Sequence, residues 1–193
     1  MNSDSLTFIF LNACIMNNFV LSMFLGICPF IGMQGNLKTA VRMGMTVTFV
    51  MVIASICATA VNLLLAYLHL EYLRLICFVC VIAGAVQLVE MLLKKKSPAL
   101  HGALGIYLPL IATNSAILAL ALFQSLNQYS FIQGLAYALG AGAGFSLVLV
   151  IIAGLRERLA LPGAPDVGRS AALSLIVAGI LSLAFMGFAG VGY

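Results

Sequence analysis

The sequence predicts an all-α integral membrane protein with six transmembrane helices, and three observations support this. Of its 193 residues, 64% are hydrophobic and only 7% are charged, whereas a soluble domain carries about 25% charged residues. The charged residues fall into tight groups that divide the sequence into six apolar stretches. Each stretch is close to the length of about 20 residues that a spanning helix needs. These features exclude a soluble globular protein, a disordered chain and a disulfide-rich secreted module.

The six apolar stretches leave room only for short loops, so we expect a single membrane domain over residues 1–193 with the lipid bilayer as its solvent. The first stretch has no basic segment before it and no small-residue cleavage site, so it is not expected to be a signal peptide. The stretches run over residues 6–31, 43–67, 74–93, 102–123, 133–155 and 171–189.

The basic residues predict the orientation of the chain. Loops one, three and five hold every Lys and Arg except Arg74. The positive-inside rule then places these loops in the cytoplasm and both termini outside, on the periplasmic side of a bacterial inner membrane. The alternative is a chain with its N-terminus inside and one span miscounted. Because the basic residues are spread over three loops without interleaved aromatic residues, no nucleic-acid partner is predicted.

The first and fourth stretches differ from the others because each combines glycine, proline and amide side chains. Such interrupted segments are typical of membrane proteins built from two repeats of opposite orientation. We therefore expect two inverted three-helix repeats, over about residues 6–93 and 102–189, with helices one and four interrupted. The residues concerned are Asn12, Asn17, Asn18, Gly26, Cys28 and Pro29 in the first stretch, and Gly105, Pro109, Thr113, Asn114 and Ser115 in the fourth.

A depth estimate brings one residue from each interrupted segment to the same level. Cys28 precedes Lys38 by ten residues, which is at most about 15 Å of helix. Ser115 follows His101 by fourteen residues, or about 21 Å. Since the hydrocarbon core is about 30 Å thick, both residues are expected near the middle of the membrane. They form the candidate site.

The other four cysteines carry weaker signals. Cys77 and Cys80 share one face of an apolar helix, so a metal-binding pair is conceivable, but a role as small hydrophobic residues is favoured. Cys14 and Cys57 have the same interpretation. The sequence contains no C-x-x-C-x-x-C run, so this chain alone shows no ferredoxin-type cluster motif.

Three further features limit the chemistry of the chain. Gly140 and Gly144 form a GxxxG pattern that favours close helix packing, within the chain or between subunits. Glu90 is the one carboxylate inside a span, and its spacing to Lys94 indicates an interfacial ion pair.

The two histidines, His69 and His101, fall in loops on opposite faces, and neither a P-loop nor a dinucleotide-binding motif is present. No complete active site is therefore expected on this chain.

Several motifs resemble the A-subunit family of the Rnf electron transport complex, and the resemblance spans about residues 10–190. The related E-subunit family of the sodium-pumping NADH:quinone oxidoreductase is the near alternative. The motifs include residues 17–21 (NNFVL), 24–30 (FLGICPF), 104–111 (LGIYLPLI) and 156–160 (RERLA).

The resemblance implies a shared metal cofactor. In that family the chain pairs with a homologous membrane subunit of opposite topology, and each partner gives two cysteines to one [2Fe-2S] cluster in the middle of the membrane. The first cysteine matches Cys28. The second stands in a Thr-Asn-Cys-Ala stretch, and here Ser115 occupies its place. Three interpretations stay open: Ser115 is a weak, harder ligand, the cluster has only three cysteines, or the position was altered by drift or engineering.

The resemblance also implies an activity. The family's complex couples electron exchange between ferredoxin and NAD to the movement of Na⁺ or H⁺, and its other redox subunits bind NAD and flavin. We therefore expect an electron-relay subunit of a translocase or oxidoreductase complex. The alternatives from the residues are a stand-alone secondary ion transporter and a purely structural membrane subunit.

Overall fold

The computed structural model describes residues 5–29, 37–68, 71–96, 114–159 and 171–187, and within these ranges every regular element is a helix. This confirms the predicted all-α class. Among the described residues, two helices are long and apolar enough to cross a membrane, α4 (Leu37–Leu68) and α9 (Phe131–Leu159). The remaining elements are α1 (Leu6–Leu11), a π-helical turn η1 (Asn12–Met16), α2 (Phe19–Met23), a 3₁₀ turn η2 (Glu71–Leu73), α5 (Arg74–Lys96), α8 (Ser115–Leu126) and α10 (Ala171–Met186).

The predicted loops are too long at several points. Lys38 and Arg42, expected in loop one, lie in the first turns of α4. The basic residues expected to start loops three and five likewise extend the C-terminal ends of α5 and α9. No glycine or proline interrupts the chain at these points, and long basic side chains can reach from a helix end into water. The groups of basic residues therefore lie in the terminal turns of these helices and not in the loops that connect them.

Some predictions fall outside the described residues. Those on Gly105 and Pro109, and on the loop histidines His69 and His101, concern residues that the structure does not describe. The predicted Glu90–Lys94 pair also lies outside the described side chains, since that of Glu90 is not among them.

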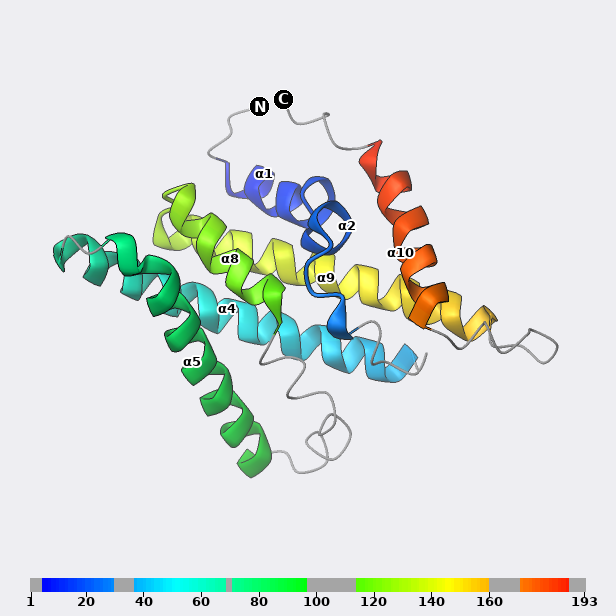
Figure 1. Ribbon diagram of the computed structural model, residues 1–193, viewed down its shortest axis with the longest axis horizontal. Helices are drawn as coiled ribbons and strands as arrows, with labels where there is room; N and C mark the ends of the chain where they lie inside the picture. Colours follow the sequence, from blue (N-terminus) through cyan, green and yellow to red (C-terminus); the bar gives the residue numbers. More distant parts are fainter. Residues whose placement is uncertain (1–4, 30–36, 69–70, 97–113, 160–170, 188–193) are drawn as a thin grey trace.

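Helices α4 and α9 pack against each other along the centre of the molecule and run in opposite directions (Figure 1). Their closest approach is reciprocal. A Cβ added to Gly44 would lie 2.7 Å from Ser146 Oγ, and one added to Gly142 would lie 2.6 Å from Thr48 Cγ2. Each hydroxyl donates a hydrogen bond to the carbonyl four residues earlier, and the two hydroxyl oxygens are 3.2 Å apart. Each helix thus gives one small residue and one hydroxyl to the crossing.

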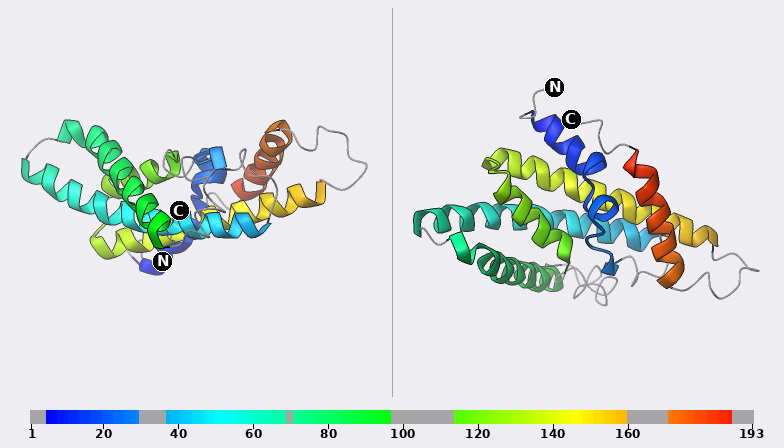
Figure 2. Two further views of the ribbon diagram at one scale, coloured as in Figure 1. Left: turned by 90° about the horizontal axis from the view of Figure 1, so that it is seen from below. Right: turned by 45° about the horizontal axis from the view of Figure 1, so that its top comes forward.

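The other helices pack around this central pair in matching positions. α8 packs on α4, and α2 packs on α9, where α1 and η1 also lie. α5 contacts α4 and α8, whereas α10 contacts α9 and α2, and the two lie on opposite flanks of the pair (Figures 1 and 2). Exchanging the first half of the chain with the second therefore maps these contacts onto one another.

The GxxxG pattern lies at an interface within the chain. A Cβ added to Gly140 would lie 2.5 Å from the carbonyl oxygen of Phe10, and one added to Gly144 would lie 2.5 Å from that of Cys14. Both contacts are with the backbone, which cannot move aside as a flexible side chain can. The small residues of α9 thus allow α1 and η1 to lie directly against it.

Candidate functional site

Two asparagines begin helices at corresponding places in the two halves of the chain. Asn18 caps α2, and its Oδ1 accepts a hydrogen bond from the Val20 N–H at 3.0 Å. Asn114 caps α8 in the same way, with the Ala116 N–H at 3.0 Å. Both side chains are buried. A side-chain cap satisfies a backbone donor that an apolar environment would otherwise leave unpaired, so each asparagine allows a helix to begin there.

The helix that follows Asn18 is very short. α2 ends after five residues because Phe24 adopts a left-handed conformation, with φ of 54°. The Phe24 N–H then donates to the Val20 carbonyl oxygen at 3.1 Å, as at a helix end with a left-handed residue. The Leu25 N–H donates to the Phe19 carbonyl oxygen at 2.9 Å. A bulky residue in this conformation is strained. The interruption expected in the first segment is thus present, and it lies directly before Cys28.

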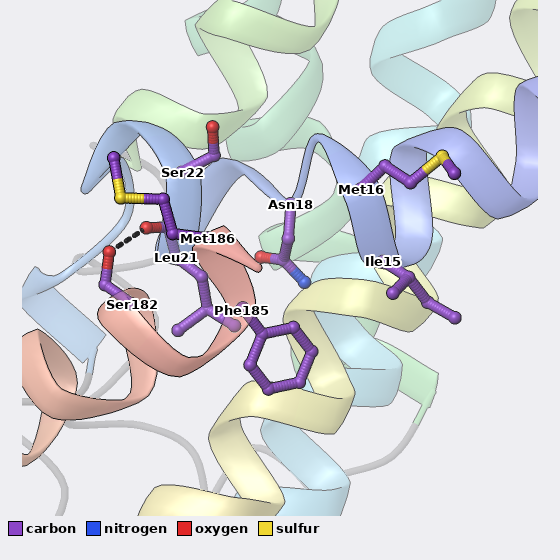
Figure 3. Close-up of a pocket in the computed structure, with 8 residues that line it drawn as sticks. All are labelled: Ile15, Met16, Asn18, Leu21, Ser22, Ser182, Phe185 and Met186. Carbon is purple, nitrogen blue, oxygen red and sulfur yellow. Dashed lines mark hydrogen bonds between the residues drawn. The ribbon is translucent and has the colours of Figure 1, made fainter. Parts of the chain in front are cut away.

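Helix α10 holds the short helix in place. The Ser182 hydroxyl donates to the Leu21 carbonyl oxygen, one of the carbonyls that so short a helix cannot pair internally (Figure 3). The side chain of Asn18 completes the support, because its Nδ2 donates to the Cys14 carbonyl at 3.0 Å. A cavity of about 120 Å³ lies between η1, α2 and α10 at this point. Both the start and the end of α2 are therefore fixed by hydrogen bonds to other elements.

A hydrogen bond joins the two capped segments across 89 positions of sequence. The Gly26 N–H donates to Ser115 Oγ at 3.0 Å. Gly26 has φ of +78°, and a Cβ there would lie 2.8 Å from Phe145 Cε2 and 2.9 Å from Asn114 Oδ1. Only glycine fits this position, for both its conformation and its surroundings. The chain is thereby held against Ser115 just two residues before Cys28.

Cys28 and Ser115, the two predicted site residues, are both exposed at the surface of the chain, on the segments that this bond joins. A thiolate is a soft ligand that suits iron–sulfur chemistry, and a hydroxyl is a harder one. Within the described residues, no group of three or more His, Cys, Asp or Glu side chains could hold a metal ion. At this exposed position the chain thus offers the thiol of Cys28 and the hydroxyl of Ser115 as possible ligands.

The other four cysteines lie on other elements of the fold. Cys77 is half-buried and Cys80 exposed on α5, while Cys14 and Cys57 are half-buried. All five cysteines are free thiols. The interpretation of these four as small hydrophobic residues stays a prediction.

The two capping asparagines differ in one respect. Asn114 is 4% exposed, and its Nδ2 has no hydrogen-bond acceptor in the described part of the chain. The same atom of Asn18 is paired with Cys14. An unpaired buried donor costs about 1–3 kcal/mol. The second segment thus carries an unfavourable polar group directly beside Ser115, and the first does not.

The structure also shows a polar cluster that the sequence analysis missed. Gln124, expected in loop four, lies in α8, and its side chain bonds to Ser55 and Thr59 of α4, each at 2.8 Å. The adjacent Ser125 hydroxyl donates to Asn62 Oδ1 at 2.9 Å. The signal was available, because Ser55, Thr59 and Asn62 follow the i, i+4, i+7 spacing of one helix face.

Known proteins resemble this chain along nearly its whole length. The model of the Rnf-Nqr subunit family, described as a membrane protein, matches residues 6–192. The A-subunit of an ion-translocating oxidoreductase complex from Syntrophotalea carbinolica is 52% identical, over 96% of this chain and 97% of that protein. The A-subunit of the Na⁺-translocating ferredoxin:NAD⁺ oxidoreductase complex from Acetobacterium woodii is 48% identical over the same shares.

These matches agree with the all-helical fold and its apolar helices. A third relative, the A-subunit of an ion-translocating oxidoreductase complex from Yersinia enterocolitica, is 49% identical over 94% of this chain and 95% of its own length. The chain therefore belongs to the Rnf-Nqr family of membrane-protein subunits.

Proposed function

We propose that this chain is an electron-relay subunit of an ion-translocating ferredoxin:NAD oxidoreductase complex. In this proposal Cys28 and Ser115 form one half of a [2Fe-2S] site, and a homologous membrane subunit of opposite topology supplies the other half. The hydrogen bond between Gly26 and Ser115 carries the proposal, because it brings the two interrupted segments together. The relatives named as A-subunits of such complexes support the assignment to a complex with other redox subunits.

The residues present fit half of such a site. The exposed Cys28 supplies a thiol, and thiolate is the usual ligand of an iron–sulfur cluster. Ser115 Oγ accepts one N–H and keeps a second lone pair for a metal. Since a [2Fe-2S] cluster takes four ligands, two positions on this chain require a partner. When bound, the cluster would supply one-electron exchange with the redox subunits on either side of the membrane.

The surrounding residues of this chain would position the two ligands. Asn114 fixes the start of α8, so that Ser115 stands at its first turn. Gly26 holds the segment before Cys28 against Ser115, and Phe145 limits the space behind it. The partner subunit would cover the exposed face and exclude water from the site.

The reciprocal packing of the helices supports the proposed inverted repeats. The contacts of α2, α4 and α5 correspond to those of α8, α9 and α10 when the two halves are exchanged. The matched Gly and hydroxyl pairs at the α4–α9 crossing lie where an internal two-fold axis would pass. Two repeats of this kind suit alternating access of ions to the two sides of the membrane. The charge distribution supports an orientation with both termini outside a bacterial inner membrane.

The test compares two exposed cysteines in the purified whole complex. Cys28→Ala is expected to remove about two iron atoms per complex, one EPR signal of the reduced enzyme and at least nine-tenths of ferredoxin-dependent NAD⁺ reduction, because it removes a ligand. Cys80→Ala, on α5, is the matched control and should change none of these. Unchanged iron content and EPR spectra in the Cys28→Ala complex would remove this residue from the redox site.

A further inference from the structure

A second cavity lies far along the chain from Cys28, between α4, α8 and the beginning of α9. Its volume is about 230 Å³, which is enough for several water molecules, since one needs about 10–15 Å³. Polar side chains in apolar helices usually face a protein interior or a water-filled cavity. The polar residues that line this cavity are Thr59, Asn62, Gln124, Ser125, Tyr129 and Ser130.

Two hydroxyl groups at this cavity have their hydrogens committed elsewhere. The Thr59 hydroxyl donates to the Ser55 carbonyl oxygen at 3.0 Å. The Ser125 hydroxyl donates to Asn62 Oδ1 at 2.9 Å. A hydroxyl has one hydrogen and two lone pairs, so the Ser125 oxygen is left as an acceptor. The Thr59 oxygen keeps one lone pair after accepting a hydrogen bond from Gln124 Nε2 at 2.8 Å. The Asn62 oxygen also keeps a lone pair after accepting from Ser125, so three acceptor oxygens belong to one cavity.

The surroundings favour a positive charge of low valence. No charged side chain is among the described residues that line the cavity, and divalent cations in proteins are usually held by carboxylates. α8 ends beside the cavity at Leu126, and a helix C-terminus carries partial negative charge. Burial raises the pKa of the Tyr129 phenol, so this side chain stays neutral at physiological pH.

We propose that this cavity, lined by Thr59, Asn62 and Ser125, binds a partly hydrated monovalent cation of the size of Na⁺. The cavity is lined by residues at the end of α8 and the start of α9, and these helix ends lie on the side of the molecule where α4 ends (Figure 1). In the proposed orientation this is the outer side, so the cation would stand at the external end of the ion path. That role rests on the proposed function, but binding itself does not.

The test counts bound ions directly. Equilibrium dialysis of the purified whole complex against ²²Na⁺, at an ionic strength fixed with choline chloride, gives the number of ions per complex. Ser125→Ala and Thr59→Val are each expected to lower this number by one. Thr46→Val is the matched control, because Thr46 also lies on α4 and donates to the carbonyl four residues earlier, but does not line the cavity. The control should bind as many ions as the unmodified complex.

Unchanged ion counts in both variants would overturn the proposal, and so would displacement of this ion by K⁺ as readily as by unlabelled Na⁺. The EPR spectrum and iron content of the same samples report separately on the redox site. Loss of one bound ion with unchanged spectra supports the cation site whether or not the Cys28 proposal holds. A missing cluster signal in the unmodified complex would contradict the redox proposal alone.

Discussion

The segments that begin at Asn18 and Asn114 share the same side-chain helix cap, but the helices that follow differ in length. Each asparagine caps a helix through the N–H two residues later. After Asn18 the helix ends within five residues, at the left-handed Phe24, whereas after Asn114 it continues for 12 residues. The amide of Asn18 is paired and that of Asn114 is not, within the described residues. The cap sets where a helix begins, and the packing around it decides how far the helix extends.

Because of this difference, the two site residues are held in place by different parts of the structure. Ser115 stands in the first turn of a regular helix. Cys28 follows two left-handed residues, Phe24 and Gly26, in a segment held by hydrogen bonds to other parts of the chain. Ser115 is fixed by the regular helix that it begins. Cys28 begins a helical turn, and the position of that turn depends on contacts of the preceding segment that single substitutions can remove.

The largest effect is expected for Gly26→Ala, which alters the segment that positions Cys28. The substitution forces a left-handed alanine against Phe145 and Asn114, and strain with overpacking should cost about 3 kcal/mol. The Cys28 segment should then separate from Ser115. Thermal unfolding in detergent and iron content of the complex are the measurements.

Gly84→Ala provides the control for this change. Gly84 lies in α5, and a Cβ added there would meet nothing within 4 Å in the described structure. Alanine is a better helix former than glycine by about 0.5–1 kcal/mol, so this variant should be as stable as the unmodified protein or slightly more stable. Equal losses in the two variants would mean that the close packing at Gly26 is not what matters.

A smaller effect separates the two caps. Asn18→Ala removes a cap and the bond to Cys14, each worth about 1 kcal/mol. Asn114→Ala also removes a cap, but it removes an unpaired buried donor too, and the relief of about 1–3 kcal/mol offsets the loss. Unfolding in detergent should therefore show a loss of about 2 kcal/mol for Asn18→Ala and almost none for Asn114→Ala. Equal destabilisation would contradict the account of the unpaired amide.

The sequence predicted the helical class and the apolar segments because hydrophobicity and charge grouping are local properties. It did not predict the limits of several helices. Lys38 and Arg42 were expected in a loop, although they lie in the first turns of α4. It also placed Gln124 in a loop because the stretch from 124 to 130 holds no charge. The hydrogen bonds that keep Gln124 inside α8 come from α4, 65 and 69 positions away, and no local pattern contains them.

The candidate site was predictable in part. Glycine, proline and asparagine indicated the interruptions, and the resemblance pointed to Cys28 and Ser115. The left-handed Phe24 could not be anticipated, because its residue type disfavours that conformation and tertiary contacts impose it. The bond from Gly26 to Ser115 joins distant segments and is a property of the packed helices. The contact between the Thr48 and Ser146 hydroxyls likewise joins segments 98 positions apart.

The central claim is that both interrupted segments meet at one redox site, and Ser115→Cys tests it most directly. The EPR spectrum of the reduced whole complex should change its line positions, because a ligand position beside the iron would pass from oxygen to sulfur or gain a thiolate. Ser125→Cys, in the other polar cluster on α8, should leave the spectrum unchanged. A spectrum identical in the unmodified and Ser115→Cys complexes would show that residue 115 does not lie beside the iron, and would contradict the account.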